Sequence, residues 1–99
     1  MKSIIQENKE CFLCRYLYDS ENIFNLQDHH IFFGTANRRL SEEYGLKAWL
    51  CINHHMQGLG AVHKNRDYDI ILKKIAQKKF EENCTRQEFI QIFGKSYID

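Results

Sequence analysis

The spacing of apolar residues predicts a long amphipathic helix in the C-terminal third of the chain. Over residues 67–82, apolar residues recur at helical spacing; they are Ile71, Leu72, Ile75 and Phe80. A stripe of this kind is typical of a helix that packs one side against a core. The lysines at positions 73, 74, 78 and 79 are therefore expected on the solvated face of this helix.

A second helix is predicted to follow, because Thr85-x-x-Glu88 matches a capping box. In that motif the threonine and glutamate side chains each accept a hydrogen bond from the other residue's backbone amide. The helix is expected to continue to Phe93 and to end at Gly94, since glycine favours the left-handed conformation that closes helices. Residues 66–94 are thus predicted to form a helical scaffold.

The middle of the chain shows patterns typical of short strands. Residues 29–33 are rich in β-branched and aromatic side chains and precede a glycine, and residues 46–51 alternate in polarity. Between them, residues 41–44 are expected to form one helical turn closed by Gly45. Residues 54–56 are expected to open a short helix after the second strand. Together these elements predict an α+β fold.

The 99-residue chain is expected to form a single domain over residues 1–99. It contains no proline, no internal repeat and no low-complexity linker that would mark a boundary. A core of this size is modest and is often supplemented by a metal or a disulfide. Residues 1–10 are predicted to be a frayed tail, and the motifs that carry chemistry fall within residues 11–63.

Two pairs of metal-ligating residues can provide that supplement. Cys11-x-x-Cys14 and Cys51-x-x-His54 have the paired spacing of a structural zinc site. Residues 11–18 are accordingly expected to form a tight-turned zinc knuckle. Disulfides are the alternative, but the N-terminal residues lack a secretory signal pattern and the fourth cysteine, at position 84, has no obvious mate. We therefore favour Zn²⁺ and a reduced, cytoplasmic protein.

Four histidines remain after this zinc site is assigned: His29, His30, His55 and His63. Imidazoles that cluster beside an acidic residue are suited to a catalytic metal with an open coordination position. A histidine with a pKa near its usual value of about 6.5 can also accept a proton from water at physiological pH. The sequence therefore predicts a second, catalytic metal site.

Charge adds one candidate contact with a phosphate backbone. The net charge of +1 does not by itself indicate a nucleic-acid binder. Arg38 and Arg39 follow the paired histidines closely, and a guanidinium group can clamp a phosphate with two hydrogen bonds. An ordinary surface ion pair is the alternative for these arginines. No apolar run approaches the length that spans a bilayer, so no membrane partner is expected.

The order of the elements resembles that of the ββα-metal endonucleases, also called HNH or His-Me finger nucleases. The resemblance covers about residues 11–63 and includes similarity to small phage and prophage HNH proteins and to the nuclease domain of a recombinase-dependent phage nuclease. The motifs that carry it are His29-His30-Ile31-Phe32-Phe33-Gly34, residues 37–46, Leu50-Cys51-x-x-His54-His55 and the Gly-x-Val-His element that ends at His63. The resemblance implies a small zinc-stapled ββα-metal domain with C-terminal helices.

It also implies a metal-dependent DNA endonuclease that acts in phage recombination or DNA processing. His30 would be the general base, and His29, His55 and His63 would bind one divalent ion such as Mg²⁺, Mn²⁺, Ni²⁺ or Zn²⁺. In the alternative register, Asp28 would be the ligand and His29 the base. The partners would be DNA and a recombinase or another phage DNA-processing protein in the host cytoplasm.

Two other functions stay open from the sequence. The zinc ligands can belong to a non-catalytic zinc-knuckle module that binds nucleic acid or protein, with the remaining histidines as polar filler. The chain can also be an HNH fold without activity that serves as a partner-binding subunit. The number of bound metals, measured together with DNA cleavage, separates these functions.

Overall fold

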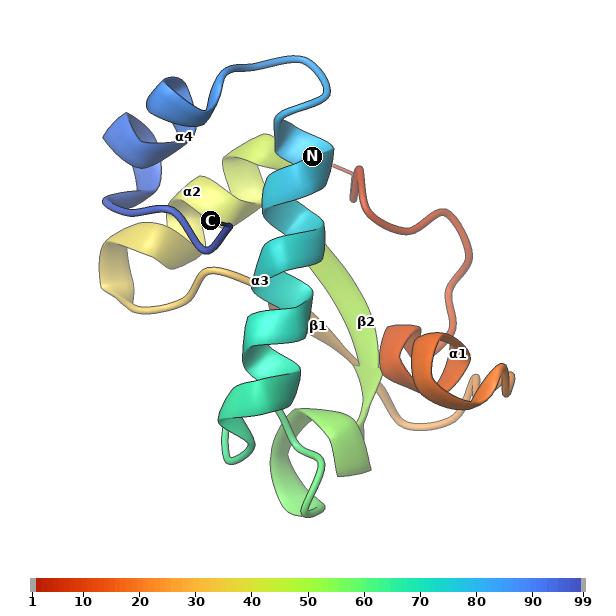
Figure 1. The fold of residues 1–99 in the computed structure, drawn as a ribbon. Coiled ribbons are helices and arrows are strands. Elements are labelled where there is room, and N and C mark those ends of the chain that lie inside the picture. Colours follow the sequence, from red (N-terminus) through yellow and green to blue (C-terminus); the bar gives the residue numbers. More distant parts are fainter. Residues whose placement is uncertain (1, 99) are drawn as a thin grey trace.

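A two-stranded antiparallel sheet lies at the centre of the computed structural model, which describes residues 2–98 (Figure 1). Strand β1 (Leu26–His30) pairs with β2 (Lys47–Cys51), with His30 opposite Lys47. The helical elements are α1 (Phe12–Tyr18), α2 (Thr35–Tyr44), the π-helical turn η1 (Asn53–Gln57), α3 (Arg66–Phe80) and α4 (Arg86–Phe93). The predicted α+β class is confirmed.

The C-terminal helices follow the predicted pattern closely. The Asn65 side chain caps α3 by accepting a hydrogen bond from the backbone amide of Tyr68. At α4 both bonds of the capping box are present: Thr85 Oγ1 accepts from the Glu88 amide at 3.1 Å, and Glu88 Oε1 accepts from the Thr85 amide at 3.2 Å. One expectation is wrong, because Lys73 is buried rather than solvated.

An aromatic cluster joins the chain after β1 to the C-terminal region. The ring centroid of Phe32 lies 4.7 Å from that of Phe93 and 5.4 Å from those of Phe89 and Tyr97. Aromatic pairs at such distances contribute about 0.5–1.5 kcal/mol beyond simple burial. This packing anchors the segment that follows His30.

Strand β1 lies earlier in the chain than the predicted strand at residues 29–33. The buried hydroxyl of Ser41 accepts a hydrogen bond from the Phe32 amide at 3.0 Å and donates one to the Phe32 carbonyl at 2.7 Å. These two bonds satisfy the Phe32 backbone in place of a neighbouring strand. His30 is therefore the last residue of β1.

Helix α2 contains ten residues, whereas the sequence predicted a single turn over residues 41–44. Its predicted end at Gly45 is confirmed, with a φ of +71° that glycine tolerates best. A Cβ atom at this position would lie 2.5 Å from the backbone oxygen of Lys2. Gly45 thus serves both the helix end and the close approach of the N-terminal segment.

Residues 2–10 do not form the predicted frayed tail. The Ile4 amide donates to the Gly45 carbonyl at 2.9 Å, Ser3 Oγ donates to the Lys47 carbonyl at 2.5 Å, and Gln6 Oε1 accepts from the Trp49 amide at 2.9 Å. The segment therefore follows β2. The segment predicted as a tight turn over residues 11–18 also differs, because residues 12–18 form helix α1, with Cys11 as its N-cap.

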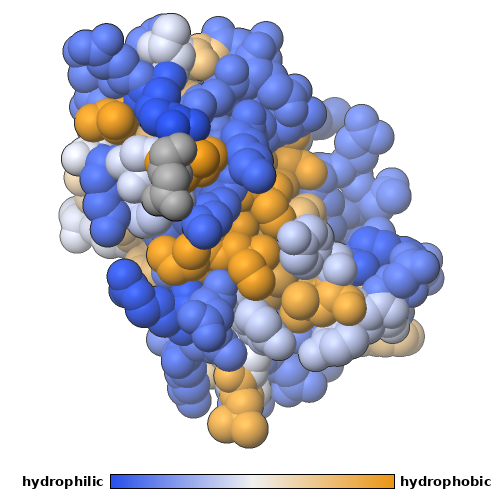
Figure 2. All heavy atoms as spheres, in the orientation of Figure 1, coloured by the Kyte–Doolittle hydropathy of each residue, from blue (hydrophilic) through white to orange (hydrophobic). Residues whose placement is uncertain are grey.

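The surface is mainly hydrophilic on the face that Figure 2 shows, with hydrophobic residues gathered between α3 and α1. None of the helices within residues 2–98 combines the length and the apolar character needed to cross a membrane.

Candidate functional site

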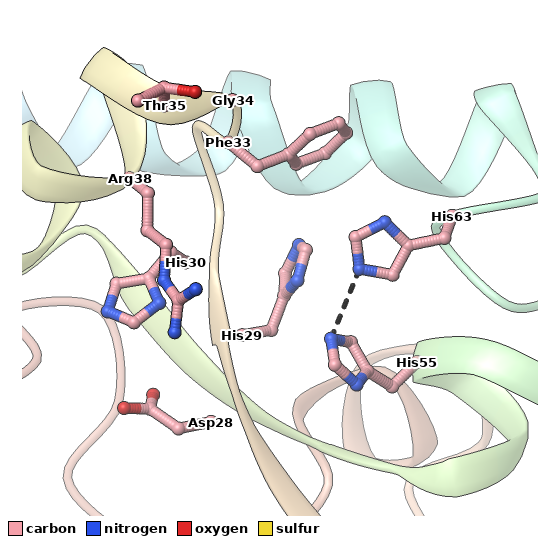
Figure 3. Close-up of a pocket in the computed structure, with 9 residues that line it drawn as sticks. All are labelled: Asp28, His29, His30, Phe33, Gly34, Thr35, Arg38, His55 and His63. Atoms are coloured by element: carbon pink, nitrogen blue, oxygen red, sulfur yellow. Dashed lines mark hydrogen bonds between the residues drawn. The ribbon is translucent and has the colours of Figure 1, made fainter.

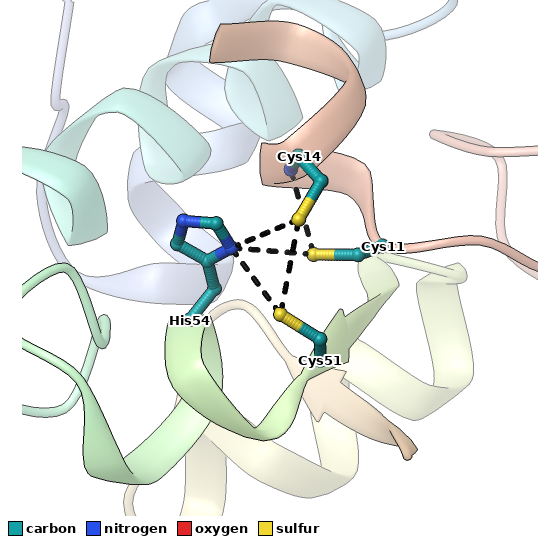
Figure 4. Close-up of side chains that lie close together, drawn as sticks. All are labelled: Cys11, Cys14, Cys51 and His54. Atoms are coloured by element: carbon teal, nitrogen blue, oxygen red, sulfur yellow. Dashed lines mark hydrogen bonds between the residues drawn. The ribbon is translucent and has the colours of Figure 1, made fainter. Parts of the chain in front are cut away.

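Four side chains converge beside the end of β2 and form what we call the Cys₃His cluster: Cys11, Cys14, Cys51 and His54 (Figure 4). His54 Nδ1 lies 3.5, 3.4 and 3.4 Å from the three sulfur atoms, in chain order, and the Sγ atoms of Cys14 and Cys51 are 3.8 Å apart. Tetrahedral zinc with Zn–S bonds of about 2.3 Å and Zn–N bonds of about 2.0–2.1 Å separates two sulfurs by about 3.8 Å and sulfur from nitrogen by about 3.6 Å. The cluster therefore has the dimensions of a site for a metal such as zinc, at the predicted residues.

Local structure explains how these ligands meet. Cys11 is the N-cap of α1, where its Sγ accepts a hydrogen bond from the Cys14 amide at 3.5 Å. Cys51 ends β2, and His54 follows in η1. Asn22 Nδ2 lies 3.7 Å from Cys14 Sγ and donates to it. Hydrogen bonds of this kind orient metal ligands from outside the coordination shell.

Burial makes the cluster dependent on a cation. It raises the pKa of the Cys11 thiol, raises that of Cys14 to about 12, and lowers the pKa of His54. Thiolates this close repel one another and lose hydration, so a bound cation is needed to keep them ionised at neutral pH. The cysteines form no disulfide within the described part of the chain. The three sulfur donors and one nitrogen donor, the distances between them and their burial together fit a Zn²⁺ ion.

A second group, which we call the imidazole cluster, contains His29 of β1, His55 of η1 and His63 from the loop before α3 (Figure 3). Their ring centroids are 4.8–5.2 Å apart, and one nitrogen from each ring lies within 4.8 Å of the others. His55 Nε2 and His63 Nε2 are separated by 3.2 Å. Two nitrogen ligands of a tetrahedral zinc ion are about 3.3 Å apart. The structure thus brings together the three histidines that were predicted to share a second metal.

His29 is the buried member of the imidazole cluster. It is 2% exposed, and its buried Nε2 has no hydrogen-bond partner within residues 2–98. Burial, followed by the charges of His55 and His63, lowers the pKa of His29 to about 3, so the ring is neutral at physiological pH. A buried ring nitrogen without a partner is costly, and a metal ion or a water molecule would satisfy it.

Gln27 orients His55. Gln27 Oε1 lies 2.5 Å from His55 Nδ1. Because an amide oxygen only accepts, His55 donates from Nδ1 and retains its lone pair on Nε2, the atom nearest His63. Gln27 and His29 are two residues apart on β1 and share one side of the strand. Gln27 is not among the predicted site residues, because the predicted strand begins at position 29.

His30 lies on the other side of β1, where it meets a carboxylate from α2. His30 Nε2 is 2.9 Å from Glu42 Oε1, and Lys47 Nζ donates to Glu42 Oε2 at 2.8 Å. These two partners, Lys47 above all, lower the pKa of Glu42 to about 2. An ionised carboxylate only accepts, so His30 donates from Nε2 and keeps a lone pair on Nδ1. Glu42 is not among the predicted site residues, since a contact between a strand and a helix leaves no local pattern in the sequence.

Asp28 lies with His30 rather than with His29. Ligand atoms of Asp28, His30 and Glu42 lie within 4.8 Å of one another. In Figure 3 the β1 ribbon separates Asp28 and His30 from His29. In the alternative register, Asp28 as the ligand and His29 as the base would therefore point to opposite sides of the strand.

One hollow of about 420 Å³ nevertheless reaches both sides of the strand end; we call it the histidine hollow. Its lining comprises Asp28, His29, His30, Phe33, Gly34, Thr35, Arg38, His55 and His63 (Figure 3). The imidazole cluster and His30 thus face a common space because β1 ends at His30. Arg38 also lines this space, whereas Arg39 is exposed and does not belong to its lining.

Comparisons with known proteins leave the chain without an assigned relative. No family model, no curated protein and no solved structure matches it.

Proposed function

We propose that this protein is a metal-dependent DNA endonuclease of the HNH type that hydrolyses phosphodiester bonds. The observation that carries the proposal is the shared position of the imidazole cluster and His30 around the histidine hollow. A set of metal ligands and a separate base at one open space is suited to the hydrolysis of a phosphodiester. The sequence resemblance extends the proposal to phage recombination or DNA processing in the host cytoplasm, with a recombinase as a candidate partner.

In this proposal His29, His55 and His63 hold one divalent ion, Zn²⁺, Ni²⁺, Mn²⁺ or Mg²⁺. The unpartnered Nε2 of His29 and the 3.2 Å between the other two Nε2 atoms support this fit. Such an ion supplies positive charge that stabilises the developing negative charge on the phosphate and the leaving 3′-oxygen.

His30 acts as the general base. Glu42 holds the Nε2–H at 2.9 Å, so Nδ1 is the atom that accepts a proton from water while the water oxygen attacks phosphorus. The resulting imidazolium is stabilised by the Glu42 carboxylate. Arg38, in the same hollow, offers its guanidinium group to a phosphate oxygen. The Cys₃His cluster has a structural role.

A metal-titrated plasmid-nicking assay tests the proposal. Wild-type protein with its structural zinc should nick or linearise supercoiled DNA when Mg²⁺, Mn²⁺, Ni²⁺ or Zn²⁺ is added. His30→Ala should reduce the rate by about 10²- to 10⁴-fold while leaving the circular dichroism spectrum unchanged. The exposed Lys74 provides a control variant, Lys74→Ala. The absence of cleavage by the wild-type protein with every one of these metals would contradict the proposal.

A non-catalytic zinc module that binds nucleic acid or protein is the second candidate. The Cys₃His cluster favours it, since that cluster is complete without the imidazole cluster. Tyr18 adds a suitable surface, because the residue is 64% exposed and the centroid of its ring lies 6.3 Å from that of His54, in a stacked arrangement. One zinc per chain, no binding of a second metal and no cleavage would favour this candidate.

A further inference from the structure

A second hollow, of about 280 Å³, adjoins the histidine hollow and is lined by basic residues; we call it the basic hollow. Its lining includes Arg66 at the start of α3, Lys73 within α3 and Lys95 after α4, together with Asn37 of α2. Segments far apart in the sequence therefore bring three cationic side chains to one place. The helical pattern predicted Lys73 on a solvated face, and neither Arg66 nor Lys95 is among the predicted site residues.

The charge in the basic hollow is not balanced. Its one carboxylate, Asp69, already accepts a hydrogen bond from Lys73 Nζ at 2.5 Å. Among residues 2–98, Arg66 and Lys95 take part in no ion pair. Three cations against one carboxylate leave an excess of two positive charges.

The three cationic side chains line one small space, so their charges act on one another. Burial is the main cause that lowers the pKa of Lys73, whose side chain is only 8% exposed; Asp69 opposes this shift, and the charges of Arg66 and Lys95 add to it. Holding like charges near one another in a concave, partly dry space is unfavourable, and an anion would relieve that repulsion. The basic hollow therefore has the properties of an anion-binding site.

Phe33 separates the two hollows and lines both of them. One side of the ring meets Lys73, whose Nζ lies 4.0 Å from the ring centroid, and the ring centroids of His63 and His29 lie 5.1 and 6.0 Å away. Figure 3 shows Phe33 between His29 and the ribbon of α3. The Phe33 ring would thus lie between an anion in the basic hollow and the imidazole cluster.

We propose that the basic hollow binds a backbone phosphate of the DNA strand, adjacent to the phosphate at the imidazole cluster, and that Arg66 and Lys95 are its main ligands. The inference rests on the proposed function, because it takes the anion to be part of the same DNA strand. It extends that function by predicting the path of the strand over the protein surface, from the histidine hollow past Phe33 toward α3.

DNA binding measured by fluorescence anisotropy tests this inference. A labelled duplex is titrated with zinc-loaded protein that carries His30→Ala to prevent turnover, over a range of NaCl concentrations. Arg66→Gln and Lys95→Gln should each weaken binding by about tenfold. Each should also reduce the slope of log K against log[salt] by about 0.9, the value for one lost phosphate contact. Lys74→Gln removes one charge from the exposed side of the same helix and should leave both quantities unchanged.

Conservative variants separate a lost contact from a lost fold. Arg66→Lys and Lys95→Arg retain the charges and should restore most of the affinity. If Arg66→Gln and Lys95→Gln bind DNA as Lys74→Gln does, the inference is wrong even when the wild-type protein cleaves DNA. If both weaken binding as expected but the wild-type protein does not cleave, the basic hollow stands as a DNA-binding site and the proposed endonuclease activity is wrong.

Discussion

His54 and His55 are neighbours in the chain, yet their imidazoles belong to two separate clusters. His54 Nδ1 lies 3.4 Å from Cys51 Sγ, whereas His55 Nε2 lies 3.2 Å from His63 Nε2. Successive residues on a helical turn point in different directions, so η1 presents one ring to each side. Both histidines lie in η1, so a metal bound at the Cys₃His cluster through His54 would also fix the position of His55.

The first prediction is that the protein contains one tightly bound zinc and unfolds when it is removed. Structural zinc contributes about 10–16 kcal/mol of binding free energy in small zinc-finger peptides, and this energy is also folding energy. Elemental analysis, and circular dichroism before and after chelation, measure the two effects. Cys51→Ser should lose the zinc, whereas Cys84→Ser, outside the cluster, should retain it. A zinc-free protein with an unchanged melting transition would show that the core alone maintains the fold.

The second prediction concerns Glu42 as a positioning residue. Glu42→Gln keeps the size of the side chain but removes the charge that faces His30 at 2.9 Å, so kcat for DNA cleavage should fall by roughly tenfold. The metal concentration required for activity should stay the same, because Glu42 lies outside the imidazole cluster. Glu43→Gln, at the exposed neighbouring position, is the matched control. Equal rates for both variants would remove Glu42 from the mechanism.

The choice between the two histidine registers gives a third prediction. At saturating metal, His30→Ala should be inactive, whereas His29→Ala should recover part of its activity because a lost ligand can be offset by a higher metal concentration. Cleavage rates measured over a metal titration distinguish these behaviours. Activity in His30→Ala, together with none in His29→Ala at any metal concentration, would establish the Asp28–His29 register instead.

The zinc ligands and the C-terminal helices could be predicted because their signals are local. Two Cys-x-x-ligand pairs specify four donors, and Thr85-x-x-Glu88 specifies a helix start, whatever the rest of the chain does. The grouping of His29, His55 and His63 came from the family resemblance rather than from spacing.

The parts that could not be predicted depend on contacts between distant segments. The end of β1 at His30 is set by Ser41, which satisfies the backbone of Phe32 from α2. The defined conformation of residues 2–10 depends on hydrogen bonds to Gly45 and to β2. In each case the hydrogen-bond partner lies at least nine residues away in the sequence, so the periodicity of the segment itself does not predict the contact.

The fourth prediction is a loss of stability at mildly acidic pH that depends on His29. Its pKa is about 3 in the folded protein and about 6.5 in an unfolded chain. Between these values the unfolded chain binds a proton that the folded protein does not, so the free energy of unfolding falls as pH drops below about 6.5, by at most about 1.4 kcal/mol per pH unit. Urea unfolding at pH 7.5 and 5.5 should show a larger loss for the wild type than for His29→Gln. An equal loss in both proteins would assign the effect to other groups, such as the zinc ligands.

The last prediction is that His55→Ala raises the metal concentration needed for cleavage more than it lowers the rate at saturation. A lost ligand weakens metal binding, whereas a lost base slows proton abstraction, and a metal titration of the cleavage rate separates the two. Gln27→Ala should have the same effect to a smaller degree, because it removes the acceptor that fixes His55 through Nδ1. Met56→Ala, at an exposed neighbouring position, is the control. A structure soaked with Mn²⁺ or Ni²⁺ gives the direct test: a metal that does not contact His55, or His63 turned away from the metal, would remove that residue from the ligand set.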